Sequence, residues 1–192
     1  MMRLRDSIEL LVIGGSAGSL SVVLKMLPLF KYIKVPVIII FHRKANTEDP
    51  ILIDLLTSRT EYFVKEADDK DELQSNVIYL APAEYHLLIE NNRSLTLDDS
   101  EKINYSRPSI DVTFESASEV YKEKLACVLL SGANADGVKG LEAAKKRGSM
   151  IIVQDPSTAE ASFMPQKAIE ALLPDFILTP DNLKELFESL NG

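Results

Sequence analysis

A serine, a histidine and an aspartate each follow an apolar, strand-like run in this chain, and together they could form a nucleophile with its base. Ser16 lies in the glycine turn 14–18, His42 comes directly after the run 35–41, and Asp136 lies in a loop after a third run. A histidine can take the proton of a serine hydroxyl, and an aspartate can orient that histidine. The three residues therefore predict a serine hydrolase.

The glycine turn has several interpretations. A dinucleotide-binding G-x-G-x-x-G pattern that starts at Gly14 would need glycines where Ser16 and Ser19 stand, and the Gly-Lys-Ser/Thr of a phosphate loop is absent. The pattern Gly14-x-Ser16-x-Gly18 does fit an elbow that presents a nucleophilic serine. An ordinary glycine-rich turn between a strand and a helix is the alternative, and the turn alone does not separate the two.

The chain has only two histidines, His42 and His86. Histidine is the usual general base near neutral pH, and His42 has the position at a strand end that this role requires. A packing histidine is the alternative for His42. His86 begins a predicted hairpin strand, where we expect a surface or packing residue, with lining of the cleft as its other role.

Asp136 has two competing roles. It could accept a hydrogen bond from His42 as the third member of a triad. It could instead cap the helix that follows Gly137, since aspartate is common at helix N-termini. Asp111, in the first turn of a predicted helix, and Asp155, before a proline in a turn, are weaker candidates for the acid.

The elements that must position these residues alternate between strands and helices. Continuous apolar runs are typical of strands buried on both faces, and such strands alternate with amphipathic helices in doubly wound sheets. We therefore predict an α/β fold, a three-layer, doubly wound and mainly parallel sheet. Its carboxyl edge would gather the loops that leave the strands. The predicted strands are 8–13, 35–41, 126–130, 150–154 and 176–178, and the predicted helices are 18–28, 51–56, 109–122, one after 137, 165–172 and one from 181.

The middle of the chain has a different pattern. Four short strands, separated by polar turns, indicate antiparallel hairpin additions at an edge of the sheet. No repeat, low-complexity tract or linker interrupts the sequence, so residues 1–192 are expected to form a single domain. The four strands are predicted at 62–67, 76–81, 86–89 and 94–97.

Composition excludes several classes of function. The net charge of -8 and the isoelectric point near 4.9 argue against general binding of nucleic acid or anionic lipid. The sequence has neither a membrane-length apolar stretch nor a signal-peptide pattern, and its one cysteine, Cys127, lies in an apolar run as an inert buried thiol. These features predict a cytoplasmic protein. Two distant histidines and one buried cysteine form no recognisable ligand set, so metal binding is not expected.

The order serine, histidine, aspartate, with the elbow after the first strand, leads to a family resemblance. The chain resembles the catalytic domain of the chemotaxis-receptor protein-glutamate methylesterases, the CheB family. Several motifs in register carry this resemblance over most of the chain. They are VIGGSAG (12–18), IIFH (39–42), YLAPAEYHL (79–87), SRPSID (106–111), LSGANADG (130–137) and ASFMP (161–165).

The resemblance implies hydrolysis of methyl esters on glutamate side chains of methyl-accepting chemoreceptors or related signalling proteins, and also deamidation of their glutamines. By the same resemblance, Ser16, His42 and Asp136 would be the catalytic residues. The backbone amides of Ala17 and Ala133 would receive the oxyanion. No metal or cofactor is implied.

The chain departs from the family pattern at several points. In the nucleophile loop, Ala17 and Ser19 replace a threonine and a glycine of the family pattern. After the histidine, Arg43 and Lys44 replace methionine and proline, and in the aspartate loop Ala133 replaces a methionine. The receiver domain that usually precedes the catalytic domain is absent from this sequence, which therefore supplies no phosphorylation-controlled regulation. Two alternatives stay open: a small-molecule carboxylesterase, and a non-catalytic signalling or docking module of the same fold.

Cationic side chains near the predicted site could attract an acidic receptor helix. Arg43, Lys44 and Arg107 are the candidates, and ordinary solvated surface charge is the alternative for each.

Overall fold

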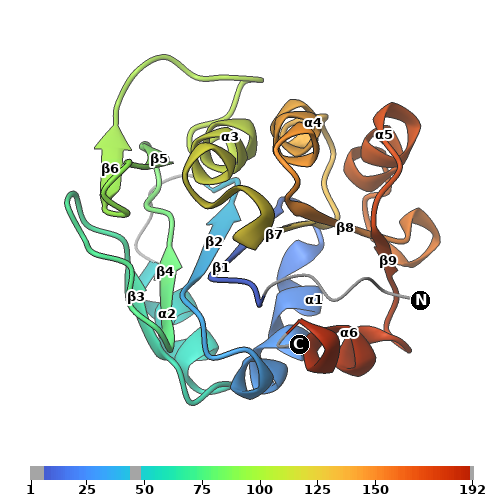
Figure 1. Cartoon of the computed structure of the whole chain (residues 1–192), viewed down its shortest axis with the longest axis horizontal. Coiled ribbons are helices and arrows are strands. Elements are labelled where there is room, and N and C mark those ends of the chain that lie inside the picture. Colours follow the sequence, from blue (N-terminus) through green and yellow to red (C-terminus); the bar gives the residue numbers. More distant parts are fainter. Residues whose placement is uncertain (1–6, 44–48, 191–192) are drawn as a thin grey trace.

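A parallel sheet of seven strands runs through the described part of the chain, residues 7–43 and 49–190 of a computed structural model (Figure 1). The strands lie in the order β3-β4-β2-β1-β7-β8-β9, and every neighbouring pair is parallel. Their bounds are β1 (Leu10–Gly15), β2 (Val37–Phe41), β3 (Phe63–Glu66), β4 (Val77–Leu80), β7 (Leu125–Leu129), β8 (Met150–Gln154) and β9 (Phe176–Leu178).

The sheet has a topological switch point between β1 and β7, where consecutive strands begin to be added on the opposite side of β1. From β1 the chain builds β2 and then its outer neighbours on one side, and later returns to place β7 on the other side. Such a reversal leaves a crevice at the carboxyl ends of the two central strands, because their connections depart to opposite faces. The loops after β1 and β7 therefore flank the natural ligand site of this sheet.

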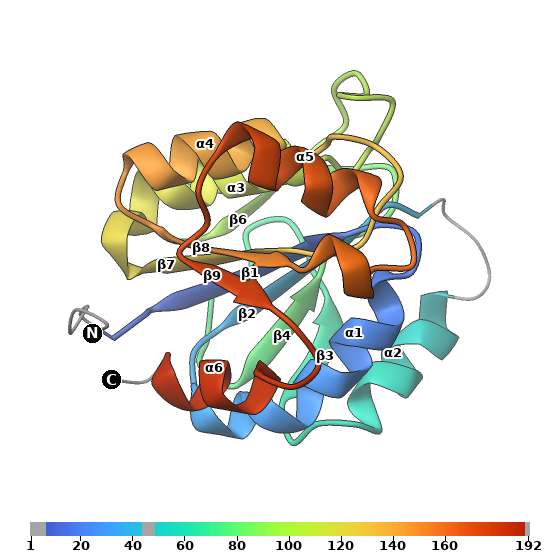
Figure 2. The same ribbon diagram turned by 90° about the vertical axis from the view of Figure 1, so that its right-hand side faces the viewer.

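Helices cover both faces of the sheet, as predicted for a three-layer fold (Figure 2). One face carries α1 (Ser19–Met26), η1 (Leu27–Tyr32), α2 (Asp49–Thr57) and α6 (Leu183–Ser189). The other face carries α3 (Ile110–Tyr121), α4 (Val138–Lys146) and α5 (Phe163–Ala171). Two short 3-10 turns, η2 (Lys122–Lys124) and η3 (Pro156–Thr158), complete the connections.

The middle of the chain contains one antiparallel hairpin, β5 (His86–Ile89) with β6 (Leu95–Asp98), and this pair packs against α3. The prediction that all four middle strands are hairpin additions was wrong for the first two. β3 and β4 belong to the main sheet and pair in parallel, with Val64 opposite Ile78. The connection between them contains no helix, which is why the sequence lacked the usual signal of a parallel crossover.

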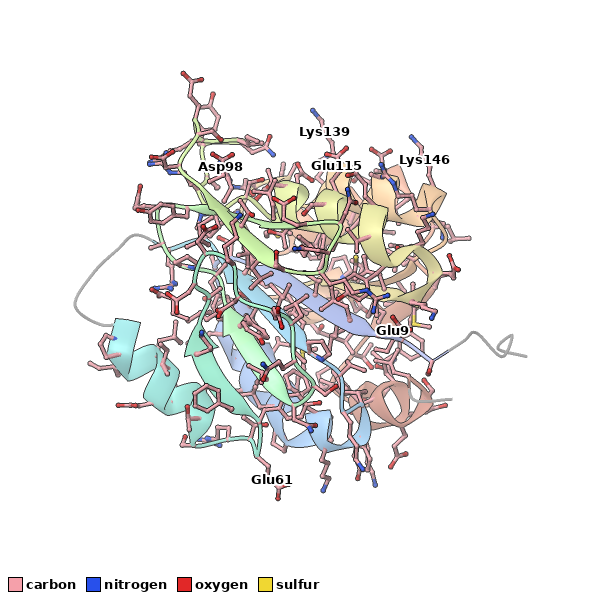
Figure 3. The ribbon with its side chains drawn as sticks, turned by 60° about the vertical axis from the view of Figure 1, so that its left-hand side comes forward. Glu9, Glu61, Asp98, Glu115, Lys139 and Lys146 are labelled. Carbon is pink, nitrogen blue, oxygen red and sulfur yellow. The ribbon has the colours of Figure 1, made fainter. Side chains whose placement is uncertain are left out.

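The side chains of the central strands alternate between two hydrophobic cores. Leu11 and Ile13 of β1 face the core that contains Phe30 of η1, whereas Leu10 and Val12 face the core that contains Phe114 of α3. Burying each such apolar side chain stabilises the fold by about 1.5–3 kcal/mol, so the buried strand ends are rigid supports. Most charged side chains lie on the outside, where Lys139 and Lys146 project from the protein (Figure 3), whereas Asp111 and Asp136 are buried.

Cys127 lies in the middle of β7 and is fully buried, as predicted. Burial raises the pKa of its thiol above the ordinary value, so the thiol stays protonated and unreactive. In the described ranges, none of the helices combines the length and the apolar character that crossing a membrane would require.

Candidate active site at the carboxyl edge of the sheet

The turn after β1 depends on two of its glycines. A Cβ on Gly14 would lie 2.4 Å from Cγ2 of Ile110, so only glycine lets the first residue of α3 approach the end of β1. Gly18 has a φ of 77° at the N-terminus of α1, a left-handed conformation that favours glycine. Ser16 stands between these positions, half-buried at the tip of a sharp turn from strand to helix.

Ser16 and His42 leave adjacent strands side by side. Gly15 pairs with Phe41 in the parallel register of β1 and β2, and the His42 amide donates to the Gly15 carbonyl at 3.3 Å. Neighbouring strands are about 4.8 Å apart. Ser16 and His42, the residues that follow β1 and β2, are therefore neighbours. The backbone register therefore places residues 16 and 42 next to each other on the carboxyl edge, and the described residues show no hydrogen bond between the Ser16 hydroxyl and His42.

The imidazole of His42 contacts the carboxylate of Asp136. Nε2 of His42 and Oδ2 of Asp136 are 2.7 Å apart, and the two side chains are 11% and 0% exposed. An ionised carboxylate only accepts hydrogen bonds, so Nε2 of His42 carries the hydrogen in this pair. Nδ1 is then the nitrogen that remains to accept a proton.

The Asp136 carboxylate also caps a helix, but not the one that its sequence position indicated. It accepts the backbone amides of Ile110 at 2.6 Å and Asp111 at 3.2 Å, together with the Ser109 hydroxyl at 2.8 Å. These groups form the N-terminus of α3, whereas Gly137 is the N-cap of the helix that follows Asp136 in sequence. Asp136 therefore joins the end of α3 to His42.

The same contacts determine the charge of Asp136. Burial by itself would raise the pKa of this carboxyl, but the hydrogen bonds from His42, Ile110 and Ser109 outweigh that effect and hold the pKa below its usual value. Asp136 is consequently ionised at neutral pH. A fixed negative charge at this position accepts the hydrogen on Nε2 of His42 and so orients the imidazole.

Ser131 ties three loops of this edge together. Its carbonyl accepts the Ser16 amide at 2.9 Å, its hydroxyl donates to the Ala17 carbonyl at 2.6 Å, and the same hydroxyl accepts the Ala161 amide at 2.8 Å. Ser131 is fully buried. Ala17 and Ala133 are exposed residues, and neither backbone amide donates a hydrogen bond within the described ranges.

Comparison with known proteins identifies the family. A family model described as CheB methylesterase matches residues 11–187. This chain belongs to the CheB methylesterase family. Membership confirms the resemblance, the α/β fold class and the hydrolase class that the motifs predicted.

Individual relatives of this CheB-family chain differ in length. A Leptospira interrogans protein named putative protein-glutamate methylesterase/protein-glutamine glutaminase is 43% identical over 184 residues, which cover 95% of each chain. A Thermotoga maritima protein-glutamate methylesterase/protein-glutamine glutaminase is 34% identical, and the match covers 93% of this chain but 54% of the relative. The crystal structure of the Thermotoga maritima CheB methylesterase catalytic domain matches with a TM-score of 0.86 and 33% identity, covering 96% and 99% of the two chains.

Other candidate residues of the CheB-family chain have separate roles. His86 is a packing residue with 1% exposure, and its ring contacts the Ser109 amide and the Glu101 carbonyl. Asp155 accepts the Ser157 amide at the start of η3. Asp111 is buried near Asp136, but its oxygens accept other donors and not His42. Sequence patterns gave no signal for the distant partners of His86 and Asp111.

The cationic candidates are engaged within the protein. Arg43 donates to Glu66 at 2.8 Å, and Arg107 donates to Glu84 at 3.2 Å and to the carbonyls of two loop residues. Neither side chain is therefore an ordinary solvated surface charge. Lys44 lies outside the described residues.

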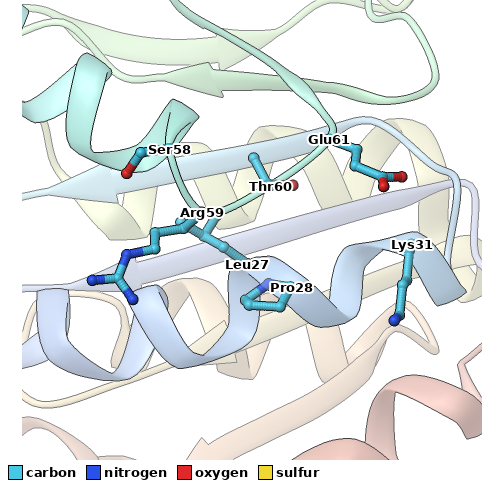
Figure 4. A pocket seen from close by; sticks show the side chains of 7 residues that line it. All are labelled: Leu27, Pro28, Lys31, Ser58, Arg59, Thr60 and Glu61. Atoms are coloured by element: carbon cyan, nitrogen blue, oxygen red, sulfur yellow. The ribbon is translucent and has the colours of Figure 1, made fainter.

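Neither a metal cluster nor the pocket beside η1 adds to this site. No group of three His, Cys, Asp or Glu side chains in ranges 7–43 and 49–190 could hold a metal ion. A pocket of about 360 Å³ lies between η1 and the segment that precedes β3, at the amino edge of the sheet (Figure 4). The residues that line it are Leu27, Pro28, Lys31, Ser58, Arg59, Thr60 and Glu61. None of the triad candidates lines this pocket.

Proposed function

We propose that this chain hydrolyses methyl esters of glutamate side chains on chemoreceptors or related signalling proteins, with Ser16, His42 and Asp136 as a catalytic triad. The observation that carries the proposal is the 2.7 Å contact between His42 and a buried, ionised Asp136, at the strand end beside Ser16. Family membership and the names of the relatives support the substrate class.

The reaction begins with a proton transfer. Nδ1 of His42 takes the Ser16 proton as Oγ attacks the ester carbonyl, and Asp136 stabilises the imidazolium. Two backbone amides, those of Ala17 and Ala133, receive the developing oxyanion. Each such donor typically contributes about 2.7–4 kcal/mol to the transition state. The side chains at these two positions do not matter for this contact, because the donor is the backbone.

Breakdown of the tetrahedral intermediate releases methanol, which takes its proton from His42. Water then attacks the glutamyl ester of Ser16, again with His42 as base, and leaves a glutamate side chain and a free hydroxyl. The same acyl-serine intermediate accounts for deamidation of glutamine, with ammonia in place of methanol. Every step uses side chains and amides of the protein alone. The proposal treats residues 1–192 as one catalytic domain acting in the cytoplasm.

Methanol release tests the proposal directly. A receptor fragment with methylated glutamates should release methanol with the wild-type chain and not with Ser16→Ala, while the unmethylated fragment is the blank. A nitrophenyl ester, assayed in parallel, separates the alternatives. Turnover of this ester alone would indicate a small-molecule esterase. Failure to turn over either substrate would indicate a non-catalytic module.

A further inference from the structure

The loop between β6 and α3 places one amide side chain between two buried carboxylates. Nδ2 of Asn104 donates to Oδ1 of Asp136 at 3.1 Å and to Oδ2 of Asp111 at 2.9 Å. A side-chain amide has two N–H hydrogens, so Asn104 can serve both acids at once. No donor of another residue type offers two hydrogens on one neutral planar nitrogen, apart from glutamine.

The second acid makes this link consequential. Asp111 is 7% exposed, and its other oxygen accepts the Gly140 amide at 2.7 Å. Burial is the largest effect on Asp111 and raises the pKa of its carboxyl above the usual value. The hydrogen bond from the Gly140 amide lowers this pKa, and the negative charge of Asp136 raises it again. Two carboxylates in one buried region oppose each other's ionisation. A donor that contacts both reduces this conflict, and the Asn104 hydrogen bond itself lowers the pKa of Asp111.

The backbone that presents Asn104 is itself held in an unusual conformation. Asn104 and Tyr105 have φ values of 50° and 62°, a left-handed region that asparagine tolerates and tyrosine rarely adopts. Tyr105 points to solvent and is 99% exposed, whereas the Asn104 amide reaches the buried acids. The loop projects beyond the layer of α3, α4 and α5 (Figures 1 and 2). The turn thus directs the Asn104 amide group toward the two acids, although the residue as a whole is exposed.

The buried imidazole of His86 fixes both ends of this loop. The Ser109 amide donates to Nδ1 of His86 at 3.1 Å, so Nε2 carries the hydrogen and donates to the Glu101 carbonyl at 2.9 Å. Arg107 donates from the far end of the loop to the Asp99 carbonyl at 2.6 Å. The loop is thus anchored independently of Asn104, which leaves the amide to act on the acids.

We propose that Asn104 is a positioning residue of the esterase site, which holds the Asp136 carboxylate in the orientation that receives His42 and separates it from Asp111. Within the described residues the Asn104 side chain donates to Asp136 and Asp111 and not to Ser16 or His42, so it would act through Asp136. The inference rests on the proposed function, because it assigns Asn104 a part in that triad.

Asn104→Ala tests the role. With nitrophenyl ester we expect kcat to fall about 10- to 100-fold and KM to change less than about twofold, since a small displacement of a catalytic group has an effect of this size. The variant Asn104→Ser keeps one hydrogen-bond donor, so its kcat should lie between those of the wild type and Asn104→Ala. It also provides a test if the alanine variant does not fold. Tyr105→Ala is the matched control on the same loop, and its kcat for this ester should match the wild type. Melting temperatures identify any variant that loses rate through unfolding.

A double variant separates positioning from general support of the loop. If Asn104 acts through the carboxylate, Asn104→Ala should change the rate less than about twofold in an Asp136→Asn background. Labelling of Ser16 by a fluorophosphonate measures hydroxyl reactivity in these slow variants. An equal loss in both backgrounds, or a single variant with wild-type kcat, would overturn the inference. A wild-type chain inactive on both ester substrates would instead overturn the proposed function.

Discussion

Replacing Asp136 by asparagine allows its two roles, orienting His42 and capping α3, to be measured separately. Oδ1 of Asp136 receives three donors, from Asn104, Ser109 and the Asp111 amide, so the new amide oxygen is expected there. The new N–H group then faces His42 and the Ile110 amide, both of which were donors to Oδ2. Nε2 of His42 can only accept from this group, so the imidazole hydrogen moves to Nδ1 and the base toward Ser16 is lost.

The magnitudes of the two effects differ. Loss of the correct tautomer should lower kcat by a factor on the order of 10⁴. One buried amide, that of Ile110, is left without an acceptor, which costs about 1–3 kcal/mol of folding free energy. For a chain of this size, about 2 kcal/mol corresponds to a fall of roughly 4–8 °C in the melting temperature. Methanol release and calorimetry measure the two quantities on the same sample.

Asp155→Asn is the matched control, because Asp155 also accepts a backbone amide at the start of a helical turn but lies away from His42. We expect it to keep the wild-type kcat. If Asp136→Asn lowered the melting temperature as calculated but kept kcat within tenfold of the wild type, Asp136 would be only a cap for α3.

Three further predictions concern the supports of the site and the core. Ser131→Ala removes the hydroxyl that joins two loops, so kcat should fall at least tenfold and unfolding free energy by about 1–3 kcal/mol, measured by turnover and urea denaturation. Gly14→Ala puts a methyl group 2.4 Å from Ile110, so stability should fall by about 1–3 kcal/mol, and an unchanged melting temperature would contradict the packing described. Burial raises the pKa of Tyr62 to about 12, so the folded state favours its protonated form, and that stabilisation is complete below pH 10. About 2–3 kcal/mol should be lost as the pH rises from 10 to 12, and Tyr62→Phe should lose this alkaline slope in denaturation curves.

The sequence predicts the edge at which the candidate residues meet. Three continuous apolar runs specify β1, β2 and β7, and parallel strands bring their following loops together, so the proximity of Ser16, His42 and Asp136 follows from pattern alone. The glycine turn also predicts the sharp bend at Ser16. What local pattern cannot predict is the helix that Asp136 caps, since its partners lie about 26 residues earlier in the chain.

The irregular segments are where prediction fails. Asn104 lies in a loop with no periodicity, and its contacts depend on backbone angles that propensity does not favour for asparagine's neighbour, Tyr105. His86 looks like the first residue of an exposed hairpin, yet α3 packs over it and supplies the Ser109 amide. In each case a tertiary contact from a distant element decides the role of the residue.

The most direct test of the triad is the site and rate of labelling by a fluorophosphonate, read by peptide mass spectrometry. Our account predicts a single adduct on Ser16, and a labelling rate that falls by at least 100-fold in His42→Ala. An adduct on another residue, or equal labelling of Ser16 with and without the imidazole, would contradict it.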